Sequence, residues 1–216
     1  MELWSMWTHL LETLLGYFAV HLGYSEAVSI IVLTLIARVA LMPVSLTSAY
    51  RMQRNKEAIE RIKPALEELR QSFKNNPSEL ATRTMALYRK NGITFLDKVS
   101  LLNIGSQGVF GIGVYQVLNR MVFSSKFLWI SNLAKPDFLL TVLVGTFVVL
   151  AMVLMPGATA DTSMLLMIAI PVLISVVAVA ALPSALGIYW ATSNAVTIVQ
   201  TLALRALLAR PRPLNA

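Results

Sequence analysis

Arg38 lies near the centre of an apolar run, where its charge requires a compensating group or indicates a functional role. The run extends from Ala27 to Leu46. An arginine in the middle of a membrane-spanning helix costs roughly 2.5–3.5 kcal/mol on insertion scales. Because a guanidinium hardly deprotonates, the cation must be hydrated, paired or used. A cation at this depth without an acidic partner indicates water or an anionic visitor.

Other polar side chains recur at helical spacing in apolar stretches. Thr34 precedes Arg38 by four residues, so the two share one helical face. Asn103 and Gln107 are also four residues apart. The last apolar stretch carries a further polar set: Tyr189, Ser193, Thr197 and Gln200, with Thr192 and Asn194 nearby. Together these residues predict a water-accessible cavity lined by three segments.

Two simpler interpretations of the same residues stay open. Serine, threonine and asparagine commonly hold membrane helices together through hydrogen bonds. Arg38 can extend its guanidinium to the membrane surface while its stem stays in the apolar region. The acidic residues Glu26 and Asp97 fall at the ends of apolar runs, so neither lies inside a run as an obvious partner.

The composition indicates an all-α membrane protein. Of the 216 residues, 56% are hydrophobic and 13% are charged, whereas a soluble domain carries about 25% charged residues. The chain has no cysteine, which excludes disulfides and thiolate chemistry. In a membrane protein, a net charge of +7 usually reports topology rather than nucleic-acid binding.

Hydropathy predicts five transmembrane helices and an interfacial helix within one domain, residues 1–216. The predicted spans are residues 27–46, 99–118, 138–155, 164–182 and 184–208. Residues 1–22 form the interfacial helix, because polar and small residues recur there in steps of three and four. These residues are Glu2, Ser5, His9, Glu12 and Gly16.

Residues 50–92 predict a helical hairpin. Between Arg51 and Lys90 there are ten basic and five acidic residues, and apolar side chains recur at helical spacing. The sequence then breaks at "NNPSE", where Asn76 suits the N-cap and Pro77 the first helical position. This pattern predicts two amphipathic helices joined by a short turn.

Basic residues set the expected orientation. The hairpin and the C-terminal tail hold most of them, and the opposite connections hold only Arg120, Lys126 and Lys135. By the positive-inside rule, the hairpin and C-terminus are cytoplasmic and the N-terminus is outside. With no Lys or Arg before Arg38, the start is unlike a basic signal or transit peptide. A bacterial plasma membrane is therefore expected.

Three stretches resemble the YidC family of membrane protein insertases. "TLIARVALMPVSLTSAYRMQ" resembles its first core span, "FLWISNLAKPD" its extracytoplasmic stretch and "LPSALGIYWATSNAVTIVQ" its last span. The resemblance runs from residue 3 to residue 208 and includes Pro64 in the hairpin. The family usually has prolines after the hairpin and around Gln107, but "NGITFLDKVSLLNIGSQGVFGIG" contains none.

The resemblance implies a five-helix core with a positively charged groove that is closed on the outer side. Arg38 matches the groove arginine, Thr34 a hydroxyl residue one turn away and Gln107 a glutamine of the second span. Tyr189 and Trp190 match an aromatic pair in a substrate-contact region. The hairpin is implied to recruit substrate. Expected partners are nascent membrane protein clients, the lipid bilayer, the ribosome and the Sec translocon, with no specific nucleic-acid sequence.

The function predicted is a membrane protein insertase and chaperone, with Arg38, Thr34, Asn103, Gln107, Tyr189, Trp190, Ser193 and Thr197 in the substrate groove. The alternative is a small-anion or solute transporter that uses the same polar cavity. An intramembrane enzyme is disfavoured, because His9 and His21 precede the first span and the sequence contains no zinc-protease motif. No catalytic residue, cofactor or metal is expected.

Overall fold

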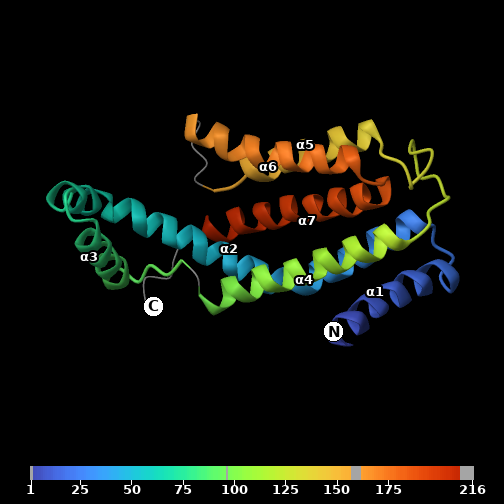
Figure 1. The fold of residues 1–216 in the computed structure, drawn as a ribbon, viewed down its shortest axis with the longest axis horizontal. Helices are drawn as coiled ribbons and strands as arrows, with labels where there is room; N and C mark the ends of the chain where they lie inside the picture. The colour runs from blue at the N-terminus through green and yellow to red at the C-terminus, as the bar shows by residue number, and fades with distance from the viewer. Residues whose placement is uncertain (1, 96, 157–161, 210–216) are drawn as a thin grey trace. The chain divides into compact units, whose positions relative to one another are not determined.

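The computed structural model describes residues 2–95, 97–156 and 162–209, without the side chains of 162–167. The described residues form seven α-helices, and their one β-type pairing is a single bridge between Phe127 and Ile130. The helices are α1 (Glu2–Val20), α2 (Glu26–Ser72), α3 (Pro77–Lys90), α4 (Lys98–Arg120), α5 (Phe138–Val153), α6 (Thr162–Ala181) and α7 (Ser184–Leu208) (Figure 1). The all-α prediction is consistent with this architecture.

The chain divides into two compact units. Unit 1 comprises Met1–Pro43 and Gly105–Ala216, and unit 2 comprises Val44–Ile104. Among the described residues, α2 and α4 are the two helices long and apolar enough to cross a membrane. Helix α5 is also apolar but has only 16 residues.

Helix α2 corrects one boundary expected from the sequence. A span ending near residue 46 and a separate helix from residue 50 were predicted, but α2 runs for 47 residues without a break. It continues through Pro43 and Pro64. Hydropathy changes sharply near residue 50, but the residues that follow are rich in Arg, Lys, Glu and Ala, which are strong helix formers. A change in polarity therefore does not end the backbone helix.

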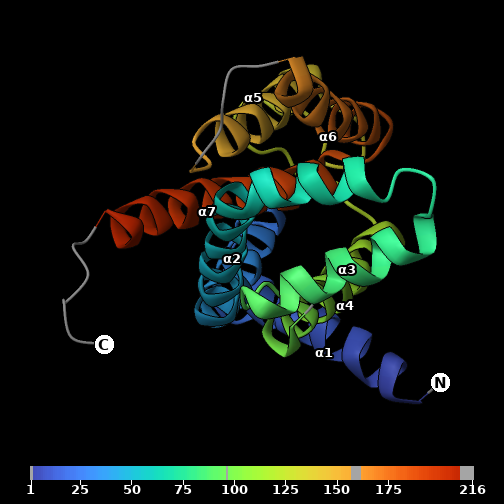
Figure 2. The same ribbon diagram turned by 90° about the vertical axis from the view of Figure 1, so that its left-hand side faces the viewer.

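Unit 1 has a hydrophobic core to which all its helices contribute. Helix α5 packs against both α6 and α7, and α6 also contacts α7. Figures 1 and 2 both show α7 next to the α5–α6 pair. The most deeply buried large side chains of this core are Leu11, Ile30, Val114, Val117, Leu118, Leu133 and Val144.

Helix α1 packs directly on α4. The Trp4 indole donates a hydrogen bond to Gln116 Oε1 (2.8 Å), and the Trp7 indole donates one to the Val109 carbonyl (3.3 Å). Gly113 allows this approach, because a Cβ there would clash with the Trp7 ring. The sequence pattern had indicated only an interfacial helix, whereas its Thr8, Leu11, Leu15 and Phe18 face is buried in unit 1.

Unit 2 contains the end of α2, a short turn and α3, which folds back after the turn (Figure 2). The predicted cap of α3 is confirmed: Asn76 Oδ1 accepts a hydrogen bond from the Glu79 backbone N–H (3.2 Å), with Pro77 in the first turn. The Arg83 guanidinium stacks over the Phe73 ring at 4.9 Å. This contact joins α3 to the turn before it.

A ladder of polar contacts joins α2 to the segment that leads into α4, all within unit 2. The paired residues run in opposite directions along the two segments: Ser45 with Asn103, Ser48 with Ser100, Arg51 with Asp97 and Asn55 with Thr94. Asp97 also caps α4 by accepting from the Ser100 backbone N–H at 2.8 Å. The N-terminal part of α4 is therefore fixed to α2 by side-chain hydrogen bonds.

Candidate functional site

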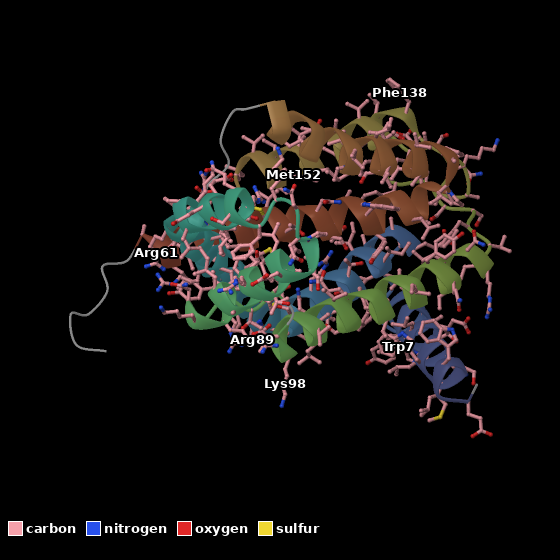
Figure 3. All side chains as sticks on the ribbon, turned by 60° about the vertical axis from the view of Figure 1, so that its left-hand side comes forward. Trp7, Arg61, Arg89, Lys98, Phe138 and Met152 are labelled. Atoms are coloured by element: carbon pink, nitrogen blue, oxygen red, sulfur yellow. The ribbon has the colours of Figure 1, made fainter. Side chains whose placement is uncertain are left out.

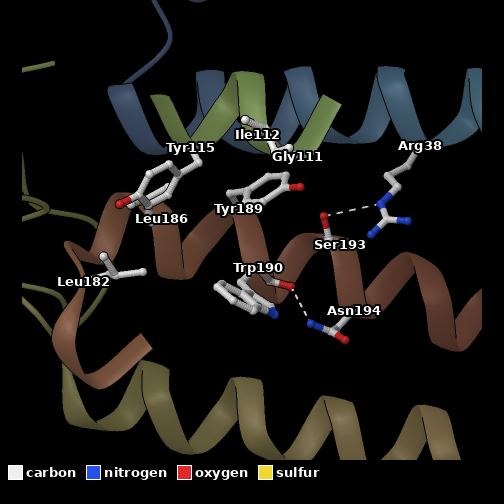
Figure 4. Close-up of a pocket in the computed structure, with 10 residues that line it drawn as sticks. All are labelled: Arg38, Gly111, Ile112, Tyr115, Leu182, Leu186, Tyr189, Trp190, Ser193 and Asn194. Atoms are coloured by element: carbon white, nitrogen blue, oxygen red, sulfur yellow. Dashed lines mark hydrogen bonds between the residues drawn. The ribbon is translucent and has the colours of Figure 1, made fainter. Parts of the chain in front are cut away.

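A cavity of about 380 Å³ lies within unit 1 (Figure 4). Its walls come from α2, α4 and α7, with Leu182 just before α7. These helices correspond to the three segments in which the sequence contains polar side chains at helical spacing. The lining residues are Arg38, Gly111, Ile112, Tyr115, Leu182, Leu186, Tyr189, Trp190, Ser193 and Asn194.

Arg38 supplies the charge at this cavity. Its Nη1 donates a hydrogen bond to Gln107 Oε1 (2.6 Å), and its Nε donates a longer one to Ser193 Oγ (3.4 Å). Both acceptors are neutral, so they orient the guanidinium without cancelling its charge. Figure 4 shows the guanidinium extending from α2 toward α7. The cavity therefore presents a fixed cation.

Aromatic side chains form much of the remaining wall. Tyr189 packs edge-on against Phe110, with ring centroids 6.1 Å apart. Gly111 leaves room for the Tyr189 hydroxyl, because a Cβ on Gly111 would lie 3.2 Å from that oxygen. Trp190 lines the cavity one residue further along α7, and its carbonyl accepts a hydrogen bond from Asn194 Nδ2 (2.8 Å).

Five of the predicted groove residues meet at this place. Arg38, Tyr189, Trp190 and Ser193 line the cavity, and Gln107 holds Arg38 from α4. This places residues separated by up to 155 positions in one hydrogen-bonded group.

The other three predicted residues have partners outside the cavity, within one helical turn for Thr34 and Thr197 and on α2 for Asn103. Thr34 is only 1% exposed, and its hydroxyl donates to the Ile30 carbonyl one turn earlier (2.7 Å). Thr197 donates in the same way to the Ser193 carbonyl (3.0 Å). Asn103 belongs to unit 2, where it accepts a hydrogen bond from Ser45 (3.0 Å). None of the three is among the residues that line the cavity.

The sequence reasoning missed several lining residues that helical spacing indicates. Gly111 and Tyr115 follow Gln107 at steps of four, so all three share one face of α4. Leu182, Leu186, Trp190 and Asn194 form a second series with steps of four. Gly111, Ile112, Tyr115, Leu182 and Leu186 were not predicted, because the prediction rested on polar residues in three segments and on residues matched to the family.

The arrangement is suited to binding an anionic group. A guanidinium beside aromatic and apolar walls attracts an anionic group, and low polarity around it strengthens the attraction. Within residues 2–95, 97–156 and 162–209, no group of three or more His, Asp or Glu side chains is placed to hold a metal ion.

Comparison with known proteins assigns the family. The family model described as 60Kd inner membrane protein matches residues 17–210. The chain is 31% identical over 194 residues to the membrane protein insertase YidC of Clostridium tetani, covering 86% of this chain and 84% of that protein. The chain belongs to the YidC family of membrane protein insertases. The resemblance seen in the three sequence motifs is thereby confirmed.

Other members of the family differ more in length. The Oceanobacillus iheyensis insertase is 30% identical over 197 residues, with 83% of this chain and 73% of that protein covered. The Helicobacter pylori insertase is 28% identical over 193 residues, which are 87% of this chain but only 34% of that protein. The family consists of inner membrane proteins, which agrees with the membrane protein predicted from the composition.

Proposed function

We propose that this protein inserts client proteins into the bacterial plasma membrane by drawing a hydrophilic flank of the client into the cavity at Arg38. One observation carries the proposal: the Arg38 guanidinium faces the cavity and is held by the neutral oxygens of Gln107 and Ser193. Its full positive charge remains available to an acidic client residue. Membership of the insertase family supports the same assignment.

The proposed mechanism lowers the barrier to crossing and involves no covalent step. A hydrophilic flank that enters hydrocarbon loses its hydration at high cost. Arg38 attracts acidic residues of the flank, and hydroxyl and amide groups such as Ser193 and Asn194 replace part of the lost hydration. The attraction has to remain weak, because a tightly held client would not be released.

The apolar segment of the client then leaves sideways into lipid. Burial of roughly 20 apolar residues in hydrocarbon drives this step. The wall formed by Tyr115, Tyr189, Trp190 and Leu186 offers an apolar surface along which such a segment can move. In this proposal, α2, α4, α5, α6 and α7 provide the five spans, and α1 lies at the membrane surface while it packs on α4.

The proposed orientation puts the α2–α3 turn and the C-terminus in the cytoplasm and the N-terminus outside, following the distribution of basic residues. Unit 2 then meets clients before they enter the membrane. Contact with a ribosome or with the Sec translocon is a separate expectation of the family resemblance and is not needed for the mechanism at Arg38.

The test is an insertion assay in proteoliposomes that contain only the purified protein. The client is a single-span protein with an acidic outer flank, and protease protection of that flank reports insertion. Protection above that in empty liposomes, reduced in Arg38→Ala, supports autonomous insertion through the cavity charge. Protection equal to empty liposomes, with the protein shown to be folded, contradicts autonomous action. A small-anion flux that depends on Arg38 in the same liposomes would favour the transporter alternative.

A further inference from the structure

The connection between α4 and α5 is fixed to the rest of unit 1. The Glu26 carboxylate, at the start of α2, accepts a hydrogen bond from Ser125 Oγ (2.6 Å). The Lys135 carbonyl accepts hydrogen bonds from the Ser184 hydroxyl (2.6 Å) and backbone N–H (3.0 Å) at the start of α7. The buried side chains of the connection are Phe123, Ile130 and Leu133. The connection is thus a packed part of unit 1.

A two-residue turn projects from this packed connection. Phe127 and Ile130 exchange both backbone hydrogen bonds (2.9 and 2.8 Å), which leaves Leu128 and Trp129 at the turn. Leu128 has a φ of 51°, a conformation that glycine adopts readily and a branched side chain does not. Yet the Leu128 side chain is 74% exposed. Burial of the Leu128 side chain within the protein therefore does not offset this unfavourable backbone conformation.

The neighbouring aromatic side chains are also presented outward. Trp129 is 48% exposed, and its indole N–H donates to Asp137 Oδ1 (3.1 Å), the oxygen that also caps α5 through Leu140 N–H. Phe138 follows this cap and is 79% exposed. Figure 3 shows Phe138 at the surface of α5. We call Leu128, Trp129 and Phe138 the tip.

The connection itself carries mostly positive charge, with the Glu26 carboxylate of α2 bound to Ser125 next to Lys126. Arg120, Lys126 and Lys135 are exposed, and the one acidic residue from 120 to 138 is Asp137, which is hydrogen-bonded to Trp129. An exposed leucine and phenylalanine, a tryptophan held by its polar edge and nearby lysines match the chemistry of the bilayer interface. There, indole rings lie at headgroup depth and basic side chains meet anionic phosphates.

We propose that the tip inserts into the interfacial layer of the membrane, with Lys126 and Lys135 on the headgroups of anionic phospholipids. The inference rests on the spans proposed above, since α5 begins at Phe138. Because the Lys135 carbonyl holds Ser184, the depth of the connection that carries the tip also sets the depth of the first turn of α7, the helix that carries Tyr189 and Trp190.

The absence of cysteine from the sequence makes a direct test available. Leu128→Cys in the full-length protein is labelled with an environment-sensitive fluorophore and reconstituted as single copies in lipid nanodiscs. Asn75→Cys, exposed in the turn between α2 and α3, is the matched control. We expect nitroxide-labelled lipid to quench the label at 128 several-fold more than the label at 75, and aqueous iodide to show the reverse order.

Lipid charge tests the second part of the proposal. In a neutral bilayer, replacing a zwitterionic nitroxide lipid by an anionic one should increase quenching at position 128, because each lysine engaged at the surface enriches the anionic lipid roughly fivefold. Lys126→Gln with Lys135→Gln should remove this increase. Iodide quenching at 128 equal to that at 75 would overturn insertion of the tip, and a lysine-independent response would overturn the headgroup contact. Insertion assays on Leu128→Cys keep these outcomes separate from failure of the insertase function.

Discussion

The two units hold their positively charged side chains in different ways. All five ion pairs among the described residues lie in unit 2. They are Arg51–Asp97, Arg54–Glu57, Lys63–Glu60, Arg70–Glu67 and Arg83–Glu79. In unit 1, Arg38 is held instead by Gln107 and Ser193, which carry no charge.

This difference distinguishes charges that stabilise the fold from a charge that can attract an anionic group. Exposed ion pairs such as those of unit 2 contribute roughly 0–1 kcal/mol each, so they support helices without creating a site. A partly buried guanidinium with neutral partners keeps its whole charge in a medium that screens it weakly. The predictions below test whether the lack of a carboxylate at Arg38 is what makes the cavity functional.

Replacing Arg38 should have the largest effect and should separate charge from shape. Arg38→Gln should lower insertion of a client with an acidic flank by roughly tenfold, the factor that about 1.4 kcal/mol represents. Arg38→Lys keeps the charge and should stay closer to the unmodified protein. The insertion rate of each variant is also measured with a neutral version of this client, in which asparagine and glutamine replace the acidic residues of the flank. An equal loss for both clients would show that Arg38 maintains structure instead of attracting acidic residues.

Altering the cavity wall should have a smaller effect that does not depend on client charge. Gly111→Ala adds a Cβ 3.2 Å from the Tyr189 hydroxyl, so that ring must shift by a few tenths of an ångström. Insertion of acidic and neutral clients should fall together, by about twofold. Gly108→Ala is the matched control on α4, because its added Cβ meets no atom within 4 Å. Similar losses in both variants would argue against a role for Tyr189.

The Asp97 ion pair of unit 2 should stabilise the fold above about pH 4 and lose this effect at low pH. Hydrogen bonds from Ser100, together with Arg51, lower the pKa of Asp97 from 3.8 to about 2. A lowered pKa means that the ionised carboxylate favours the folded state at pH values above about 4, and that this contribution is lost as the pH falls toward 2. Thermal unfolding of the protein and Asp97→Asn should therefore differ by a few degrees at pH 5 and converge near pH 2. A difference independent of pH would contradict the assignment.

Removing an exposed pair in unit 2 should have the smallest effect. Arg70→Gln breaks the contact with Glu67, three residues earlier on α2, where both side chains are more than half exposed. The expected change in unfolding free energy is below about 0.5 kcal/mol, and insertion should be unchanged. A marked insertion defect would mean that unit 2 uses its charges for client contact despite their carboxylate partners.

Sequence reasoning was most successful where local chemistry decides the structure. Asn76 and Pro77 mark the start of α3 because capping depends on a few adjacent residues. Helical spacing likewise indicated that Arg38, Gln107 and Ser193 share inward faces. In each case the necessary information lies within one or two turns of helix.

Other features depend on contacts between distant segments and could not be read from local pattern. The continuity of α2 from the first span into the hairpin was missed because hydropathy reports environment and not backbone geometry. The tryptophans of α1 bind α4 across about a hundred residues of sequence. Asn103 joins Ser45 in unit 2 because the polar ladder of α2 fixes its partner. The polarity of Asn103 is equally compatible with a place in the cavity, so the sequence could not distinguish the two positions.

The most direct test of the account is to give Arg38 the kind of partner that arginines have in unit 2. Gln107→Glu places a carboxylate of nearly identical shape at the acceptor now 2.6 Å from Arg38 Nη1. The measured quantity is the insertion rate of the acidic-flank client divided by that of the neutral-flank client in proteoliposomes. The account predicts that this ratio falls toward one in Gln107→Glu and is preserved in Gln107→Met. An unchanged ratio in Gln107→Glu would contradict the claim that the uncompensated charge of Arg38 attracts the client.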